Sequence, residues 1–245
     1  MITITTAIIK GGTGKTATAA ALAQAAKADG KRVLCIDLDT QANLSGVLGG
    51  DPTGRGVLEV LEGKPIKEMT QTTTQGLTLL TASRNLANLK TTPGSIARLK
   101  EALTATEQDF DYCIIDTPPT LGEATYNGIK AANMVLMPLE TDINSLQGMY
   151  QVLDIAARIG AAKYGAVLTR YDARPKINQY INGVIAKKCK DLGVQLFEPI
   201  RNGIAIREAA AMQKDLYSYA PNSKPAHDYM TLYKAINEIL EVANL

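Results

Sequence analysis

The stretch Ile8-Ile9-Lys10-Gly11-Gly12-Thr13-Gly14-Lys15-Thr16 joins an apolar segment to an alanine-rich one through a glycine loop that ends in Lys-Thr. The three glycines can adopt backbone angles that residues with a Cβ avoid, so successive amide N–H groups can turn inward around an anion. A helix that begins near Gly14 would add the positive end of its dipole. The spacing therefore predicts a phosphate cradle between a strand and a helix.

The loop departs from the common pattern G-x-x-x-x-G-K-[ST], because Ile9 stands where that pattern has glycine and a second lysine, Lys10, precedes the glycines. Within the pattern, Lys15 is placed for the β- and γ-phosphates and the Thr16 hydroxyl for Mg²⁺. We predict that the nucleotide phosphates are held by residues Gly11, Gly12, Thr13, Gly14, Lys15, Thr16 and Ala17.

Length and composition agree with one large α/β core. The chain has 245 residues, of which 46% are hydrophobic, and we expect a single domain over residues 1–245. Apolar runs short enough to be strands occur at residues 3–9, 32–36, 77–80, 112–115, 134–137 and 165–168, and helical segments separate them. Buried strands that alternate with helices predict a mostly parallel sheet with helices on both faces.

Other features of the composition exclude whole classes of function. No apolar run approaches the ~18 residues that a membrane helix needs, and no basic-then-apolar leader opens the chain, so we expect a cytoplasmic protein. The three cysteines form no C-x-x-C pair and are expected to be buried thiols. The single histidine, His227, leaves no histidine-based metal site or triad.

Three aspartates are expected at the carboxyl ends of strands. Asp116 follows the apolar run 112–115, at the edge where α/β sheets bind ligands, and would hold Mg²⁺ directly or through water. Asp37 and Asp39 follow the second run, where Asp37 would have an outer-shell role at Mg²⁺ and Asp39 would position the attacking water. The alternative for Asp39 is a helix cap at the start of a helix over residues 41–48.

These motifs together resemble the ParA/MinD family of P-loop ATPases, whose deviant Walker A loop has the form K-G-G-x-G-K-T found at residues 10–16. The strings D-L-D-x-Q-x-N at 37–43 and D-x-P-P-x-L-G at 116–122 are similar to the family's two switch regions, although Thr40 stands where the family often has proline. The resemblance implies the P-loop fold, ATP and Mg²⁺ as cofactors, and ATP hydrolysis. It also implies that Lys10 reaches a nucleotide across a homodimer interface.

The resemblance is weaker toward the carboxyl end. Segments 168–174 and 200–209 look like parts of the family that border the adenine, which would place Thr169 and Arg170 at the base. Residues 158–245 carry 13 lysines and arginines against 8 acids, so this third is the expected polyanion-binding surface. The DNA-contact candidates are Arg174, Lys176, Lys187, Lys188, Arg201 and Arg207.

The resemblance implies a switch that partitions plasmid or chromosomal DNA: an ATP-bound dimer that binds non-specific DNA on the nucleoid, with a ParB-like, centromere-binding partner that stimulates hydrolysis. An alternative is a ParA-like ATPase that positions a protein cargo or conjugation machinery. An amidotransferase-like or ligase activity is disfavoured by the chain's length and cysteines. The carboxy-terminal helix, expected over residues 229–244, has two acids and no base after Ile236, which disfavours docking on anionic lipid.

Overall fold

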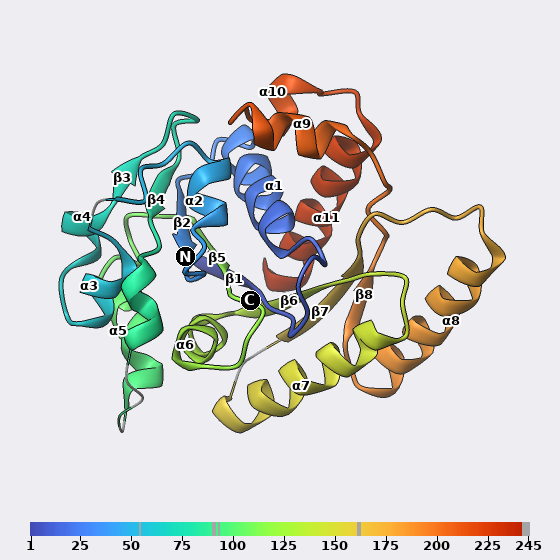
Figure 1. The fold of residues 1–245 in the computed structure, drawn as a ribbon, viewed down its shortest axis with the longest axis horizontal. Coiled ribbons are helices and arrows are strands. Elements are labelled where there is room, and N and C mark those ends of the chain that lie inside the picture. The colour runs from blue at the N-terminus through green and yellow to red at the C-terminus, as the bar shows by residue number, and fades with distance from the viewer. Residues whose placement is uncertain (54, 90–91, 93, 161–162, 242–245) are drawn as a thin grey trace.

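The computed structural model describes residues 1–53, 55–89, 92, 94–160 and 163–241, and its centre is an eight-stranded sheet in the order β3-β4-β2-β5-β1-β6-β7-β8 (Figure 1). All neighbouring strands are parallel except the pair β3 and β4. The strands are β1 (Ile2–Thr6), β2 (Val33–Asp37), β3 (Gln71–Thr72), β4 (Thr78–Leu80), β5 (Tyr112–Asp116), β6 (Met134–Leu139), β7 (Lys163–Leu168) and β8 (Gln195–Phe197).

Helices cover both faces of the sheet, as the sequence predicts. One face packs against α1 (Lys15–Ala28), α2 (Asn43–Val47), α9 (Ala205–Ala211), α10 (Leu216–Tyr219) and α11 (Lys224–Glu241). The other packs against α3 (Val57–Leu61), α4 (Ile66–Met69), α5 (Arg98–Thr104), α6 (Glu123–Ala131), α7 (Asn144–Ile159) and α8 (Lys176–Asp191). Two 3₁₀ turns lie at Arg84–Asn88 and Ser95–Ala97.

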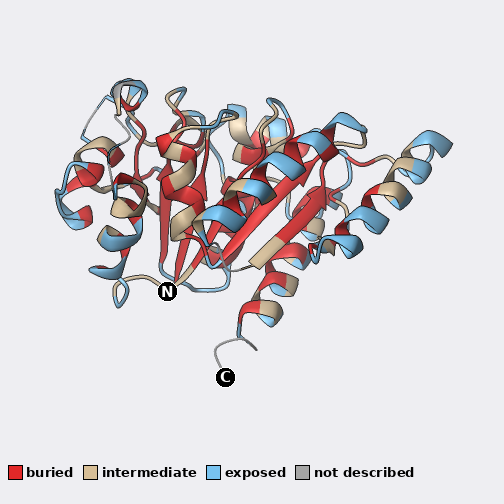
Figure 2. Ribbon diagram, turned by 90° about the horizontal axis from the view of Figure 1, so that it is seen from below, coloured by how far each residue is buried: buried red, intermediate tan, exposed pale blue. Residues whose placement is uncertain are grey.

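Successive side chains of each strand point to opposite faces of the sheet, so the core is divided between these faces. In β5, Ile114 faces α1 and α11, whereas Cys113 and Ile115 belong to the cluster under α3 to α6. Figure 2 shows the buried strands between helices whose outer sides are exposed. Burial on both faces explains why the strands read as continuous apolar runs.

Helix α1 is central because alanines occupy most of its length. Ten of its residues are buried, among them Ala19, Leu22 and Ala23, which have no exposed surface. Small side chains allow the helix to lie close to the sheet on one side and to α11 on the other. The loop before α1 is thereby fixed at the carboxyl edge of β1.

Several element boundaries differ from the sequence prediction. Helix α11 begins at Lys224 rather than at residue 229, so His227 lies in the helix. Ser223 accepts a hydrogen bond from the Ala226 amide, and proline is tolerated in a first turn. The sequence predicts that this helix continues to residue 244, but residues 242–244 lie outside the described residues. The first strand ends at Thr6 rather than residue 9, because the backbone there begins to form the glycine loop.

Candidate functional site

The glycine loop connects β1 to α1 in the conformation that its sequence requires. Gly12 and Gly14 have φ angles of 78° and 89°, in the left-handed region that side chains with a Cβ rarely adopt. Gly14 is the N-cap of α1, and its carbonyl accepts the Thr18 amide at 2.9 Å. The free amides of the first helical turn therefore face the loop, which is the geometry of an anion site.

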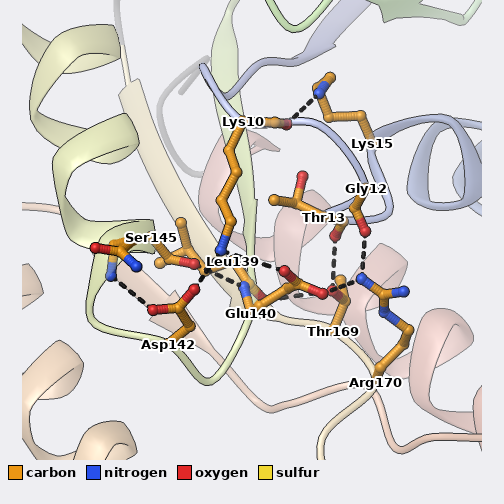
Figure 3. Close-up of polar contacts among 11 residues, drawn as sticks. Lys10, Gly12, Thr13, Lys15, Leu139, Glu140, Asp142, Ser145, Thr169 and Arg170 are labelled. Carbon is orange, nitrogen blue, oxygen red and sulfur yellow. Dashed lines mark hydrogen bonds and ion pairs between the residues drawn. The ribbon is translucent and has the colours of Figure 1, made fainter.

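Lys15 is the buried cation of the loop. Its Nζ donates to the Lys10 carbonyl at 2.9 Å, which folds the side chain back over the glycines (Figure 3). Burial lowers the pKa of Lys15, while the charges of Asp116 and Asp39 oppose that shift. A lysine held over inward-facing amides can neutralise phosphate charge.

Thr16 and Asp116 meet at the end of β5, as the sequence predicts. The Thr16 hydroxyl donates to Asp116 Oδ2 at 2.6 Å, and the Thr6 hydroxyl donates to Oδ1 at 3.0 Å. Burial, followed by the charge of Asp37, raises the pKa of Asp116 to about 7. A hydroxyl and a carboxylate beside the phosphate loop are oxygen ligands of the kind that Mg²⁺ uses, so the donor set fits this ion.

Asp37 lies next to Asp116, because the two residues are in register on neighbouring strands. Its Oδ2 accepts both the amide and the hydroxyl of Ser45 at 2.8 Å, and its Oδ1 accepts the Asp39 amide at 3.1 Å. Burial raises the pKa of Asp37 to about 6, partly offset by the Ser45 bonds. Asp37 thus holds the loop from Asp39 to Ser45 in place. The sequence did not reveal that Ser45 takes part in this contact.

Asp39 is 8% exposed and borders the groove beside the glycine loop. The alternative reading of Asp39 as a helix cap is wrong: the N-cap of α2 is Ala42, in a left-handed conformation and without a side-chain bond. Asp39 Oδ1 instead accepts the Gln41 amide at 3.0 Å, which closes a turn in the loop. This turn orients the carboxylate at the end of β2.

Thr169 and Arg170 contact the loop from behind. The Thr169 hydroxyl donates to the Thr13 carbonyl at 2.7 Å, and Arg170 donates to the Gly12 carbonyl (Figure 3). Neither residue borders the groove that contains Gly12, Gly14 and Lys15. Both therefore brace the loop, a role for which the sequence gave no signal, and contact of either residue with a base stays a prediction.

Lys10 leaves the loop on the side of β6. Its Nζ lies 2.6 Å from Asp142 Oδ2 and 3.3 Å from Glu140 Oε2 (Figure 3). Both acids directly follow β6, at the same sheet edge as Asp37 and Asp116. Sequence reasoning missed them, although their position just after an apolar strand was a usable signal.

The groove beside the loop has a volume of about 540 Å³ and runs along α1 toward α9 and α10. Its loop end contains Gly11, Gly12, Gly14, Lys15, Thr16 and Ala17, and facing them lie Asp39, Gln41, Asn43 and Pro119. The structure thus brings the predicted phosphate-binding residues, except Thr13, together with residues of the segments 37–43 and 116–122. Asp37 and Asp116 lie beneath the groove, without exposed surface.

The six basic candidates do not form one continuous patch. Arg174 and Arg201 border a hollow of about 730 Å³ formed by residues 171–174, residues 198–202 and the first turns of α11, and each is paired with an acid, Asp172 and Asp228 respectively. Lys176, Lys187 and Lys188 are exposed along α8, and Arg207 lies at the groove beside α1. Two of the six charges are therefore partly neutralised within the chain.

One expectation about composition is confirmed for the described residues. Cys35, Cys113 and Cys189 are buried free thiols. None of the described helices combines the length and apolarity that crossing a bilayer takes.

The fold and this loop define a P-loop nucleotide-binding protein with a second lysine ahead of the glycines. A family model described as an AAA domain matches residues 1–164. The sporulation initiation inhibitor protein Soj of Bacillus subtilis is 32% identical over 241 residues, covering 93% of this chain and 94% of its own length. The chromosome-partitioning ATPase Soj of Thermus thermophilus is 31% identical, covering 93% and 92%. The chain belongs to the ParA/Soj family of partition ATPases.

Solved structures share the fold of this chain. Cobyrinic acid a,c-diamide synthase of Mycobacterium smegmatis, with bound ADP and magnesium, has a TM-score of 0.81 and 30% identity, covering 96% of this chain and 94% of that one. The septum site-determining protein MinD of Pyrococcus horikoshii, complexed with Mg-ADP, has a TM-score of 0.80 over 98% of both chains. At 23% identity, that likeness supports the fold alone.

Proposed function

We propose that this chain is a Mg²⁺-dependent ATPase whose ATP-bound dimer binds non-specific DNA and partitions a plasmid or chromosome. The observation that carries the proposal is the placement of Lys10, Lys15 and Thr16 on one glycine loop, with Asp116 beneath it and Asp39 facing it across one groove. The 30%-identical structure that contains ADP and magnesium supports the same pair of cofactors here.

The nucleotide phosphates would be held by the loop amides of Gly11, Gly12 and Gly14 and by Lys15. One buried atom supports this fit: the Thr13 hydroxyl has no hydrogen-bond partner among the residues that the structure describes, although Thr13 has no exposed surface. A buried hydroxyl without a partner is costly, so a ligand oxygen within its reach would remove a penalty. Residues through Ala17 line the groove in which the ribose would continue.

Mg²⁺ would be held by Thr16 and Asp116, with Asp37 acting one shell further out. When bound, the ion neutralises charge that develops on the phosphates. The chain's own contribution to hydrolysis is Asp39, which we assign to positioning the attacking water because the Asp37–Ser45 bonds hold its loop. Contact of the adenine with Thr169 or Arg170 stays a separate prediction, because neither residue borders this groove.

Two exposed apolar side chains support a dimer in which Lys10 serves a second subunit. Leu121 follows β5 and is 44% exposed, and Ile143 follows β6 and is 55% exposed. These strands flank β1, so both residues lie on the edge from which the glycine loop emerges. Contact with a second copy would cover both and place Lys10 near the partner's phosphates.

DNA would be bound by charge, through the α8 lysines together with Arg174, Arg201 and Arg207. Such binding locates the ATP-bound form on the nucleoid of the cytoplasm. Hydrolysis by the chain alone would be slow, because Asp39 is the one acid among the described residues that border the groove. A ParB-like protein bound to a centromere site would stimulate it.

The test is binding of the unmutated protein and Lys10→Ala to random-sequence duplex DNA, with ATP·Mg²⁺ or ADP·Mg²⁺, at two salt concentrations. We expect binding only with ATP, weaker at higher salt and lost in Lys10→Ala. Loss of DNA binding in every nucleotide state, with hydrolysis intact, would refute the DNA proposal and favour positioning of a protein cargo.

A further inference from the structure

Lys10 is held by acids of its own subunit in this structure. Asp142 and Glu140 lie 2.6 Å and 3.3 Å from its Nζ, so two of the three ammonium donors are engaged (Figure 3). Lys10 is only 24% exposed, and the two acids are about one-third exposed. The contact is therefore partly shielded from water, which strengthens it relative to a pair on an open surface.

Both acids are themselves fixed in place by the start of α7. Asp142 Oδ1 accepts the Asn144 amide at 2.8 Å, and the Glu140 amide donates to Ser145 Oγ at 3.2 Å. The other carboxylate oxygen of Asp142 is thereby directed toward Lys10, whereas for Glu140 it is the backbone that is held.

The contact extends into the loop through Arg170. Its guanidinium donates to Glu140 Oε1 and also to the Gly12 carbonyl. Two cations and two acids thus form one network that includes a loop carbonyl. Any movement of Lys10 away from the acids leaves Glu140 and Asp142 with less compensating charge.

We infer that Glu140 and Asp142 form an intrasubunit clamp that competes for Lys10 with the phosphates of a second subunit's nucleotide. The inference rests on the dimer proposed above and concerns how its formation is limited. The physical reason is charge: a triphosphate brought to Lys10 while both carboxylates remain in place would meet two like charges. Dimer formation therefore requires that the clamp release Lys10.

The protonation behaviour of the pair agrees with this geometry. Burial lowers the pKa of Lys10, but the hydrogen bonds to Asp142 and Glu140 outweigh burial, so its pKa lies above the ordinary value. The Lys10 hydrogen bond likewise lowers the pKa of Asp142. Lys10 and Asp142 are both charged at neutral pH, which is the state in which the clamp is strongest.

The test compares the unmutated protein with Asp142→Asn and with the double variant Glu140→Gln/Asp142→Asn. Asparagine keeps an oxygen for the Asn144 amide, so the start of α7 is retained. Asp154→Asn is the matched control, because Asp154 is an exposed acid of α7 that pairs with Arg158 and not with Lys10. Thermal unfolding establishes that each variant is folded.

Two readouts are measured. The first is acylation of Lys10 by an amine-reactive ester without nucleotide, quantified by mass spectrometry against the exposed Lys100. The second is the dimer dissociation constant in ATP·Mg²⁺, from sedimentation velocity. We expect several-fold faster acylation of Lys10 and about tenfold tighter dimerisation in Asp142→Asn, since tenfold corresponds to about 1.4 kcal/mol, roughly one charge-assisted hydrogen bond.

Lys10→Ala separates the two proposals. If Lys10→Ala dimerises as the unmutated protein does, the proposed dimer function of Lys10 fails, whatever the clamp variants show. If Lys10→Ala stays monomeric while Asp142→Asn dimerises no more tightly than Asp154→Asn, the clamp is refuted. Weaker dimerisation of Asp142→Asn would also overturn it, because the acids would then be orienting Lys10 for its partner.

Discussion

Replacing Thr169 by valine tests whether Thr169 holds the glycine loop in its conformation or contacts the nucleotide base. The substitution keeps the shape of the side chain and removes the hydroxyl that donates to the Thr13 carbonyl at 2.7 Å. Thr169 is 3% exposed, so water cannot readily replace the lost donor. Loss of such a buried bond costs about 1–3 kcal/mol. For a chain of this length we expect the melting temperature to fall by about 2–12 °C.

The binding assay uses ATP and inorganic tripolyphosphate in parallel, measured by calorimetry. If Thr169 shapes the loop, Thr169→Val loses affinity for both ligands by a similar factor, because both need the same amides. Thr106→Val is the control: its buried hydroxyl donates to the Leu103 carbonyl, far along the sequence from the loop, so stability falls while binding is kept. Weakened ATP binding with unchanged tripolyphosphate binding would refute the brace and place Thr169 at the base.

Three further predictions concern the ion site, the core and a surface ion pair. Asp37→Asn should lower the affinity for Mg²⁺ by about 10- to 100-fold, as loss of an outer-shell partner does. Nucleotide affinity measured over a titration of Mg²⁺ tests this, and an unchanged titration would remove Asp37 from the site. Gly165→Ala should destabilise the fold by about 1–3 kcal/mol in urea unfolding, because the added Cβ would lie 2.7 Å from Phe197; wild-type stability would contradict the packing. Arg32 lowers the pKa of Asp111 to about 2. The ionised carboxylate therefore stabilises the folded state at pH values above the pKa that Asp111 has in the unfolded chain, and this contribution is lost as pH falls through about 2. The free energy of unfolding of Asp111→Asn should therefore differ slightly from that of the wild type near neutral pH, and the two values should converge in strong acid. A difference that stays constant with pH would exclude the linkage.

The parts of the structure that sequence predicted are those set by local patterns. The loop at residues 10–16 predicted the end of β1 and the start of α1, because glycine is the residue that most readily accepts the φ angles found at Gly12 and Gly14. The apolar run before Asp116 likewise placed that carboxylate at the sheet edge. In both cases the chemistry and the local geometry depend on residues within one turn or strand of each other.

The parts that sequence missed depend on contacts between distant segments. Asp142 lies 132 residues beyond Lys10, and no local pattern links them. The same holds for Thr169, which is 156 residues from the loop carbonyl that it contacts. The short strands β3 and β8 have two and three residues, too few for any periodicity to mark them, and the sheet itself determines their conformation.

The central claim is that nucleotide makes this chain a dimer through Lys10. The measurement is the molar mass of the Asp39→Ala variant by light scattering, with ATP·Mg²⁺ and with ADP·Mg²⁺, since slowed hydrolysis preserves the ATP state. We predict a change from the 26.2 kDa monomer to twice that mass with ATP alone, abolished when Lys10→Ala is added. A mass that stays monomeric in ATP, or a dimer that forms equally without Lys10, would contradict the claim.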